Sequence, residues 1–349
     1  MKSVDKLGVT KQKKVMQNKQ VRLAARPVGM PVATDFQIVT EETPELKEGD
    51  VLVQTQLISL DPAMRGWMNL GKSYIRPVEI GEVMRAGGAG QVVASENPNF
   101  EVGDFVTGTT GVQQYWHVKG GKGLLKVDTN LAPLSTWMSV LGMTGMTAYF
   151  GLLDVGAPKA GDVVLVSGAA GAVGMVVGQI AKLKGCYVVG IAGGQDKVDF
   201  LKNELGFDDA IDYKTGSLRA AMRRACPDGI DVYFDNVGAE TLDNALSMLK
   251  MKARVVICGA ISGYNNTDGA VPPKNYLSLL VNRARMEGFV VFDYADRYRD
   301  AAVQMAGWIK KGKLQSREFI VNGEVSDFLD TFTLLFEGDK IGKLLLKVA

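Results

Sequence analysis

The sequence has few of the residues that bind metals or form disulfides. Its 349 residues include three cysteines and a single histidine, His117. The cysteines, Cys186, Cys226 and Cys258, are far apart and odd in number, which argues against a disulfide framework and is typical of a reducing compartment. His117 lies in a strand-like run without partners, and we interpret it as a packed or surface histidine. We therefore predict no metal site.

Long apolar runs and a strong charge of one sign are also absent. No apolar stretch reaches the roughly 20 residues that span a bilayer, and the Lys-rich first 19 residues lack the apolar stretch of a secretory signal. The formal net charge of +2 is too small to indicate a nucleic-acid or membrane-surface partner. We expect a cytoplasmic protein with a flexible leader over residues 1–19 and no nucleic-acid or membrane partner.

Two regions of different pattern follow the leader. From about residue 21 to 141, short β-type runs are broken by Gly, Pro and Asp, which is typical of a mostly β domain. After residue 142, short apolar runs alternate with helical patterns, which predicts a parallel sheet covered by helices on both faces. Its strands are expected at 163–167, 187–192, 210–213, 230–235, 254–258 and 286–291. A final apolar run at 343–348 is expected to return to the β domain.

A glycine-rich turn after the first of these strands predicts a dinucleotide site. The run VVLVSGAAGAVG at 163–174 leads from a buried strand into a helix expected over 172–184. Gly171 allows a tight turn close to a pyrophosphate, and Gly174 lets the helix pack on the strand. The free N–H groups of the first helical turn then attract phosphate. The spacing is GxxGxxG, and the flanking strand and helix favour dinucleotide binding over a merely structural turn.

The end of the next strand favours NADPH over NADH. An NAD enzyme usually places an acid there to hold the ribose 2′-hydroxyl, but here the strand ends in Gly193 and Gly194. Lys197 can supply a cation to a 2′-phosphate, and Tyr213 can add a hydrogen bond from the end of the following strand. The alternative is that Lys197 is an ordinary surface lysine at the start of a helix.

Several further segments resemble one known family. They are SLDPAMRG at 59–66, LGMTGMTAY at 141–149, GGQDKV at 193–198, FDNVG at 234–238, CGAISGYN at 258–265 and GFVV at 288–291. In this order, they are similar to zinc-free medium-chain dehydrogenases/reductases. The branch they resemble contains the leukotriene B4 12-hydroxydehydrogenase/prostaglandin reductases, the NADPH-dependent 2-alkenal (double-bond) reductases and the bacterial curcumin reductases.

The resemblance implies an α/β fold with two domains. Residues 20–141 and 313–349 would form a GroES-like, mostly β catalytic domain. Residues 142–312 would form a Rossmann domain, a doubly wound parallel sheet that binds NADPH. The active site would lie in the cleft between them, and the family's usual pairing through the Rossmann sheet implies a homodimer.

The resemblance also implies which residues contact the cofactor. Gly171, Ala172, Val173 and Gly174 would hold the pyrophosphate, and Lys197 and Tyr213 the 2′-phosphate. The adenosine and nicotinamide side would be lined by Asn236, Cys258, Gly259, Ala260, Ile261, Ser262, Tyr264, Phe289, Val290 and Val291. Lys340 departs from a Gly-x-Asn-x-Gly-Lys pattern of the family, which removes the usual asparagine contact, but a lysine there can still meet a phosphate.

Zinc alcohol dehydrogenases share this superfamily fold, and their ligands are missing here. Catalytic zinc typically needs Cys and His ligands, but the segment 59–61 has no cysteine, and Gly81 stands where a Gly-His-Glu motif has its histidine. A four-cysteine cluster for structural zinc is missing too.

Without a metal, reduction of a conjugated double bond suits the site better than reduction of an isolated carbonyl. Hydride would add to the β-carbon of an enal or enone, and the charge would move to the carbonyl oxygen as an enolate. Tyr264, at the carboxyl end of a Rossmann strand, is the candidate donor to that oxygen, jointly with the ribose 2′-hydroxyl. The alternative is that Tyr264 only packs and positions the cofactor. Such an enzyme would detoxify reactive carbonyls.

Apolar side chains near these motifs are candidates for the walls of the substrate pocket. They are Ala63, Trp67, Met68, Tyr74, Met143 and Tyr276, each of which also fits a core position. Relatives often have Tyr in place of Ala63, which implies a different pocket here.

Three other functions fit the same residues less well. A zinc-free NADPH quinone reductase of the zeta-crystallin type is disfavoured by the segments at 59–62 and 260–265. A cofactor-sensing or nucleic-acid-binding protein would keep the fold and lose turnover, which the near-neutral charge and Tyr264 argue against. Alcohol oxidation lacks both a metal and a histidine base. The physiological substrate stays open.

Overall fold

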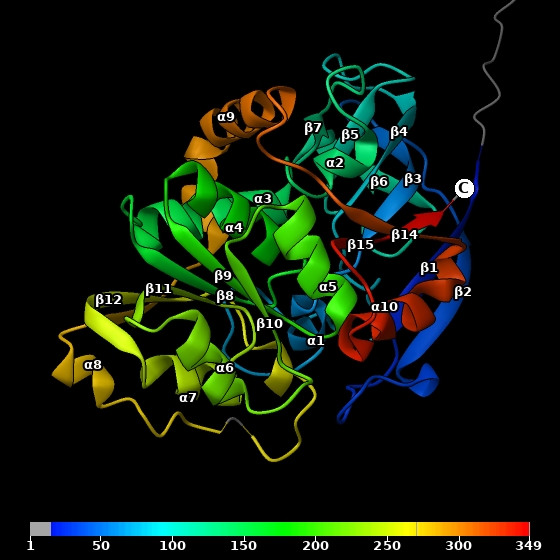
Figure 1. The fold of residues 1–349 in the computed structure, drawn as a ribbon. Coiled ribbons are helices and arrows are strands. Elements are labelled where there is room, and N and C mark those ends of the chain that lie inside the picture. The colour runs from blue at the N-terminus through cyan, green and yellow to red at the C-terminus, as the bar shows by residue number, and fades with distance from the viewer. Residues whose placement is uncertain (1–14, 270, 349) are drawn as a thin grey trace, which may run out of the picture.

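The structure is a computed structural model that describes residues 15–269 and 271–348. Figure 1 shows one domain built mainly of strands and, beside it, a domain in which helices surround a sheet. The expected leader at 1–19 falls largely on residues 1–14, which lie outside the described residues. Residues 17–19 already belong to strand β1 (Gln17–Leu23), so the strand domain includes residues that the sequence assigned to the leader.

The strand domain combines segments from both parts of the chain that flank the helical domain. Its seven-stranded sheet has the order β14-β15-β3-β4-β5-β7, with β6 paired to β3. These strands are β3 (Val51–Ser59), β4 (Gly88–Ser95), β5 (Phe105–Gly108), β6 (Tyr115–Val118), β7 (Leu125–Lys126), β14 (Glu318–Gly323) and β15 (Lys343–Val348). β1 pairs separately with β2 (Phe36–Glu42). β15 runs antiparallel to β3, which confirms the expected return of the run at 343–348.

Three helices of this domain are α1 (Ala63–Trp67), α2 (Leu134–Trp137) and α10 (Phe328–Glu337). α10 buries Phe328, Phe332 and Leu335, which are spaced to form one apolar stripe. This stripe packs in the same core as Met64 of α1 and Leu344 of β15. The core therefore fixes α1, α10 and β15 relative to one another at the boundary with the other domain.

The helical domain contains a six-stranded, fully parallel sheet of order β10-β9-β8-β11-β12-β13. Its strands are β8 (Val163–Ser167), β9 (Tyr187–Ala192), β10 (Asp209–Asp212), β11 (Ile230–Asp235), β12 (Leu249–Ile257) and β13 (Arg285–Gly288). Numbered from β8, the order is 3-2-1-4-5-6, the doubly wound arrangement that binds ligands where the order reverses. The α/β class and the Rossmann sheet are thus confirmed.

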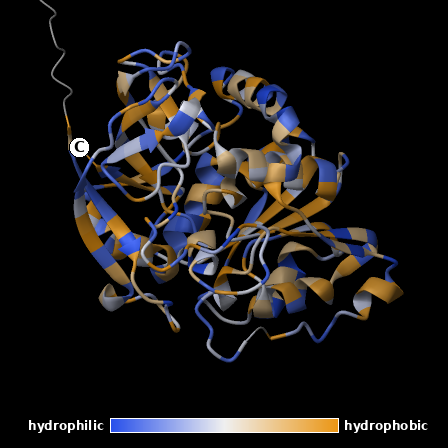
Figure 2. Cartoon of the chain, turned by 180° about the vertical axis from the view of Figure 1, so that it is seen from behind, coloured by the Kyte–Doolittle hydropathy of each residue, from blue (hydrophilic) through white to orange (hydrophobic). Residues whose placement is uncertain are grey.

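Helices cover both faces of this sheet. They are α3 (Met143–Phe150), α4 (Gly174–Leu183), α5 (Gln195–Asp199), α6 (Leu218–Ala225), α7 (Ala239–Leu246), α8 (Ser278–Val281) and α9 (Tyr298–Lys310). Successive residues of β8 point to opposite faces: Val164 and Val166 pack on the core of α3 and α4, and Leu165 packs on the core of α6 and α7. Because both faces are covered at the centre of the sheet, β8 and β9 are almost entirely apolar, and Figure 2 shows hydrophobic colour on the strands of this domain.

The largest differences between predicted and observed boundaries are at three elements. α4 begins at Gly174 rather than 172, and β12 begins at Leu249 rather than 254. β13 ends at Gly288, although the apolar pattern extended the strand to 291. The chain leaves the sheet there and turns into a 3-10 helix at Val291–Arg297. Residues 289–291 are therefore free of the sheet and available to a cavity.

Candidate active site

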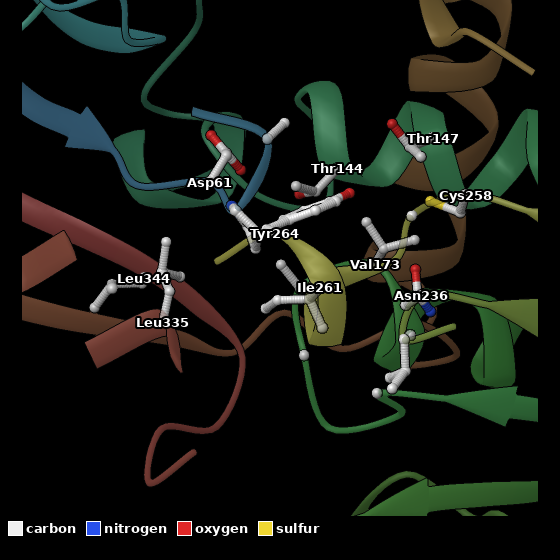
Figure 3. Close-up of a pocket in the computed structure, with 18 of the residues that line it drawn as sticks. Asp61, Thr144, Thr147, Val173, Asn236, Cys258, Ile261, Tyr264, Leu335 and Leu344 are labelled. Atoms are coloured by element: carbon white, nitrogen blue, oxygen red, sulfur yellow. The ribbon is translucent and has the colours of Figure 1, made fainter. Parts of the chain in front are cut away.

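A cavity of about 560 Å³ lies between the two domains, beyond the carboxyl ends of β8, β9, β11 and β12. The Rossmann domain lines it with the glycine-rich turn and the segments that follow the other three strands. The strand domain lines it with the α1 segment, the end of α10 and the start of β15. A parallel sheet of this order binds its ligand at the same place. Figure 3 shows side chains from both domains that line this cavity.

The glycine-rich turn is closely packed at its third glycine. An added Cβ at Gly174 would lie 2.4 Å from the carbonyl oxygen of Gly168, so no side chain fits there. At Gly171 the same oxygen would be 3.1 Å away. Gly168 itself has a φ of +58°, a conformation that favours glycine. The turn therefore presents backbone to the cavity, and the position of this backbone at the N-terminus of α4 makes it a suitable binding place for phosphate.

The ends of β9 and β10 form a positively charged corner of the cavity. A Cβ added to Gly193 would lie 2.8 Å from the ring of Tyr213, so this ring packs directly on the glycine backbone. The Lys197 ammonium donates to the carbonyl oxygen of Gly338. Burial, and after it the charge of Lys214, lowers the pKa of Lys197. A bound anion would relieve this repulsion, so the corner suits a phosphate group.

Lys340 also lines the cavity and lies close to the glycine-rich turn. The turn and the segment of Lys340 are joined by a hydrogen bond of 2.8 Å from the Gly342 N–H to the Ala170 carbonyl. Burial, followed by the charges of Lys343 and Lys197, lowers the pKa of Lys340 to about 8. Lys197 and Lys340 both line the cavity here, so this is its positively charged end.

Tyr264 lies in the middle of the cavity wall (Figure 3). Its phenol oxygen accepts a hydrogen bond of 3.2 Å from the Ala260 N–H. A Cβ on Gly259 would lie 2.9 Å from this oxygen, so the glycine is needed for the tyrosine to lie where it does. Burial raises the pKa of Tyr264 above its usual value, which keeps the hydroxyl protonated at neutral pH. Since the oxygen already accepts from Ala260, its O–H group is directed to a different partner and can donate to a ligand.

Behind the cavity, Asp235 holds the segment that follows β11. One carboxylate oxygen accepts hydrogen bonds from the Ser167 hydroxyl (3.0 Å), the Tyr233 hydroxyl (2.7 Å) and the N–H groups of Val237 and Gly238 (3.0 and 2.9 Å). The Asn236 amide group donates to the Ser167 carbonyl at 2.7 Å. This network positions Asn236 at the cavity wall. Sequence reasoning missed it, although an acid at the end of a strand is a visible signal.

Most of the cofactor residues expected from the sequence line this one cavity. They are Gly171, Ala172, Val173, Gly174, Lys197, Tyr213, Asn236, Cys258, Gly259, Ile261, Ser262, Tyr264, Phe289, Val290, Val291 and Lys340. Ala260 does not line it and reaches it only through its bond to Tyr264. Burial raises the pKa of the Cys258 thiol to about 12. The thiol is therefore uncharged at neutral pH and lines the cavity without acting as a nucleophile.

The candidate substrate walls divide into two groups. Ala63, Trp67, Tyr74 and Met143 line the cavity. Met68 and Tyr276 do not. Met68 is fully buried in the core of the strand domain, and the prediction is wrong because Met68 continues the helical path of α1 one turn after Met64 and packs in the same core. Tyr276 is 57% exposed outside the cavity.

Other lining residues were not predicted (Figure 3). Asp61, Thr144 and Thr147 lie within the segments that resemble the family, but the sequence alone did not indicate that their side chains line the cavity. Leu335 and Leu344 come from α10 and β15, where nothing in the sequence indicates a cavity.

A second, smaller cavity of about 310 Å³ adjoins the first and shares Ala63, Trp67, Tyr74 and Tyr264 with it. The Trp67 indole N–H lies 3.4 Å from the Tyr74 hydroxyl, so these two rings form a common wall. The shared residues therefore lie where a ligand would extend from one cavity into the other.

Metal-ligand clusters and membrane-spanning helices are both absent from the described part of the chain. Residues 15–269 and 271–348 contain no group of three or more His, Cys, Asp or Glu that could hold a metal ion. His117 pairs with Asp50 at 2.8 Å in the sheet of the strand domain. Within the same residues, no helix is both long and apolar enough to cross a membrane.

Comparison with known proteins gives matches along almost the whole chain. Residues 19–127 match the N-terminal domain of oxidoreductase, and residues 172–307 match a zinc-binding dehydrogenase model. The NADPH-dependent curcumin reductase of Escherichia coli is 40% identical over 339 residues, covering 95% of this chain and 97% of that protein. The NADP⁺-dependent 2-alkenal reductase of Nicotiana tabacum is 41% identical over 340 residues, covering 95% and 98%. CurA from Vibrio vulnificus in complex with NADPH has a TM-score of 0.90 at 42% identity, covering 95% of this chain and 99% of that one.

Proposed function

Because the chain belongs to the zinc-free medium-chain dehydrogenase/reductase family, with the curcumin and 2-alkenal reductases, we propose that it is an NADPH-dependent enal and enone reductase. Hydride adds to the β-carbon of an α,β-unsaturated aldehyde or ketone. A proton that comes ultimately from solvent then adds to the α-carbon of the resulting enolate, and the product is the saturated carbonyl compound. The zinc-free NADPH quinone reductase is the alternative that the assay below has to separate.

The state of the Tyr264 hydroxyl carries this proposal. It is protonated, it faces the cavity, and its oxygen is oriented by the Ala260 N–H, so it can donate to a substrate oxygen. When hydride reaches the β-carbon, negative charge develops on the carbonyl oxygen as an enolate. A well-placed donor to such an oxygen contributes about 3–4 kcal/mol to the barrier reduction. Tyr264 is therefore proposed as the catalytic donor.

The glycine-rich turn and the lysines around it fit a phosphorylated dinucleotide. The turn has no room for a side chain at Gly174, and its positive end contains Lys197 and Lys340. Residues 171–174 would hold the pyrophosphate, and Lys197 with Tyr213 would hold the 2′-phosphate. Bound NADPH supplies the hydride. Asn236, held by the Asp235 network, and residues 289–291 would orient the nicotinamide end.

The assay follows NADPH oxidation by absorbance with a 2-alkenal, its saturated aldehyde and a quinone, each repeated with NADH. We expect turnover of the 2-alkenal to the saturated aldehyde, with NADPH preferred. Tyr264→Phe removes the hydroxyl and keeps the ring, so kcat should fall about 10²- to 10³-fold. Good activity on the quinone with none on any enal would refute the double-bond assignment. An unchanged kcat in Tyr264→Phe would leave the tyrosine with a packing role alone.

We further propose that the protein is a cytoplasmic homodimer. Cys186, Cys226 and Cys258 are all free thiols, which supports a reducing compartment. β13 is the last strand of the parallel sheet, and all four of its residues are exposed. Beside it, α8 exposes Leu280 (75%) and Val281 (67%). A second copy paired along β13 would continue the sheet and cover these apolar side chains.

A further inference from the structure

Arg65 of α1 is a buried charged side chain that the proposed mechanism does not use. It is only 3% exposed. Its Nε donates to the Gly29 carbonyl at 3.0 Å and to the Asn265 side-chain oxygen at 3.1 Å. One terminal nitrogen donates to the Asn69 side-chain oxygen at 2.6 Å, and the other to the Pro27 carbonyl at 3.0 Å. Burial lowers the pKa of this guanidinium, so these neutral oxygens stabilise a charge held out of water.

One of the four acceptors differs from the others. Gly29, Asn69 and Pro27 belong to the strand domain, whereas Asn265 belongs to the Rossmann domain and is 200 positions from Arg65 in the chain. Asn265 directly follows Tyr264. The arginine therefore connects the strand domain to the segment that bears the proposed catalytic hydroxyl.

The backbone around Arg65 supports the same contact. A Cβ added to Gly29, which has a φ of +72°, would lie 3.8 Å from the Asn265 carbonyl oxygen and 4.0 Å from the Thr267 methyl group. The loop at 27–29 thus packs against the segment 265–267. Through one guanidinium group, Arg65 is hydrogen-bonded to both this loop and this segment.

The Tyr264 segment has few other means of holding its position. Within the described residues, the other hydrogen bonds of 264–268 are local: Tyr264 N–H to Ile261, Asn266 N–H to Gly263, the phenol with Ala260, and Thr267 with Asp268. The bond from Arg65 is the one that reaches a distant part of the chain. Without it, the segment would keep its local turn but lose its attachment to the opposite wall of the cavity.

We propose that Arg65 is a positioning residue that holds the Tyr264 segment against the strand domain and so aims the phenol at the substrate oxygen. This role rests on the proposed function, because it requires the Tyr264 phenol to be the donor to the substrate oxygen. Arg65 also fixes Asn69, which lines the second cavity together with Tyr264. One buried cation thus sets the relative position of the hydroxyl and of the neighbouring substrate space.

The test removes the acceptor rather than the arginine, because an unpaired buried charge would destabilise the fold. Asn265→Ala leaves Arg65 its bonds to Gly29, Asn69 and Pro27. We expect kcat on a 2-alkenal to fall roughly tenfold, since small displacements of a catalytic group slow the reaction strongly. Asn265→Asp keeps an acceptor and should restore the rate. Asn266→Ala, at the exposed neighbour, is the matched control and should behave as the wild type.

A double-mutant cycle with Tyr264→Phe distinguishes positioning from a general structural effect. If Arg65 and Asn265 act through the phenol, Asn265→Ala should change kcat less than about twofold once the hydroxyl is absent. An equal loss of rate in both backgrounds would overturn the proposal.

Amide hydrogen exchange gives a readout that does not depend on turnover. The peptide covering 261–268 should exchange faster in Asn265→Ala and at the wild-type rate in Asn265→Asp and Asn266→Ala. Unchanged exchange in Asn265→Ala would show that Arg65 does not hold the segment. If the wild type reduces no enal, the proposed function fails, and the exchange experiment still decides whether Arg65 holds the segment.

Discussion

At the scale of single residues, Lys340 is expected to make cofactor binding depend on pH. Burial, Lys343 and Lys197 lower the pKa of its ammonium to about 8, so the positive charge is lost as the pH rises through that value. An anionic dinucleotide favours the charged form. We therefore expect the Kd for NADPH to rise about tenfold from about pH 7 to pH 9, measured by fluorescence titration.

Substitutions at Lys340 separate its charge from its packing. Lys340→Arg stays charged from about pH 7 to pH 9, so its Kd for NADPH should stay low and should not change with pH. Lys340→Met has no charge at any pH, so its Kd for NADPH should be high and should not change with pH. A wild-type Kd that is constant across this range would mean that Lys340 does not contact the phosphates.

Whether a residue's place in the site was predictable depended on what fixes its position. Tyr264 was predictable because the strand and turn before it determine where the ring lies, and both have local signals. Met68 was wrongly assigned because only the packing of α1 decides that the residue after its last turn points inward. Arg65 lies in a motif that was noticed, yet its partner Asn265 is 200 positions away, and no local pattern indicates that pairing.

At the scale of elements, the junction of β8 and α4 depends on one glycine. In Gly174→Ala the new methyl group would lie 2.4 Å from the Gly168 carbonyl oxygen, so the turn has to shift. We expect the free energy of unfolding to fall by about 1–3 kcal/mol and the affinity for NADPH to fall with it. Chemical denaturation and fluorescence titration measure the two effects.

The matched control for this substitution is Gly307→Ala. Gly307 lies in the helix α9, and an added Cβ meets nothing within 4 Å. Alanine should therefore stabilise the protein by up to about 1 kcal/mol through its helix propensity. Equal behaviour of the two variants would contradict the steric argument at the turn.

Strands were predicted best where burial is uniform. The runs at 163–167, 230–235 and 343–348 have the bounds of β8, β11 and β15, because most residues of each are apolar and all but one of each are buried. β12 starts earlier than predicted because its first half contains polar, exposed residues: Lys250 is half-buried, and Met251 and Lys252 are exposed. Leu249 pairs with Ile230 of β11, and a register shift separates this pair from the continuous pairing that begins at Arg254, which an apolar pattern does not reveal.

At the scale of the whole molecule, the open edge at β13 gives a prediction about assembly. A charge at Leu280 or Val281 would be buried without a partner between two copies. Leu280→Asp and Val281→Asp should therefore convert the dimer to a monomer in size-exclusion chromatography with light scattering. Val102→Asp alters a residue that is 68% exposed in the strand domain and should leave the mass unchanged. A monomeric wild type would refute the proposed dimer.

The pairing of Lys343 with Asp61 joins residues 282 positions apart. β15 also pairs with residues 57–59 of β3, so during synthesis this end of β3 has an open edge until β15 leaves the ribosome, after the whole parallel sheet has been made. Open edges recruit other strands, and domains fold as units while the chain grows. We expect the newborn chain to be most prone to aggregation in this interval. In the cell, the Rossmann domain would therefore be complete and accessible to NADPH before β15, the strand that completes the site, has been synthesised.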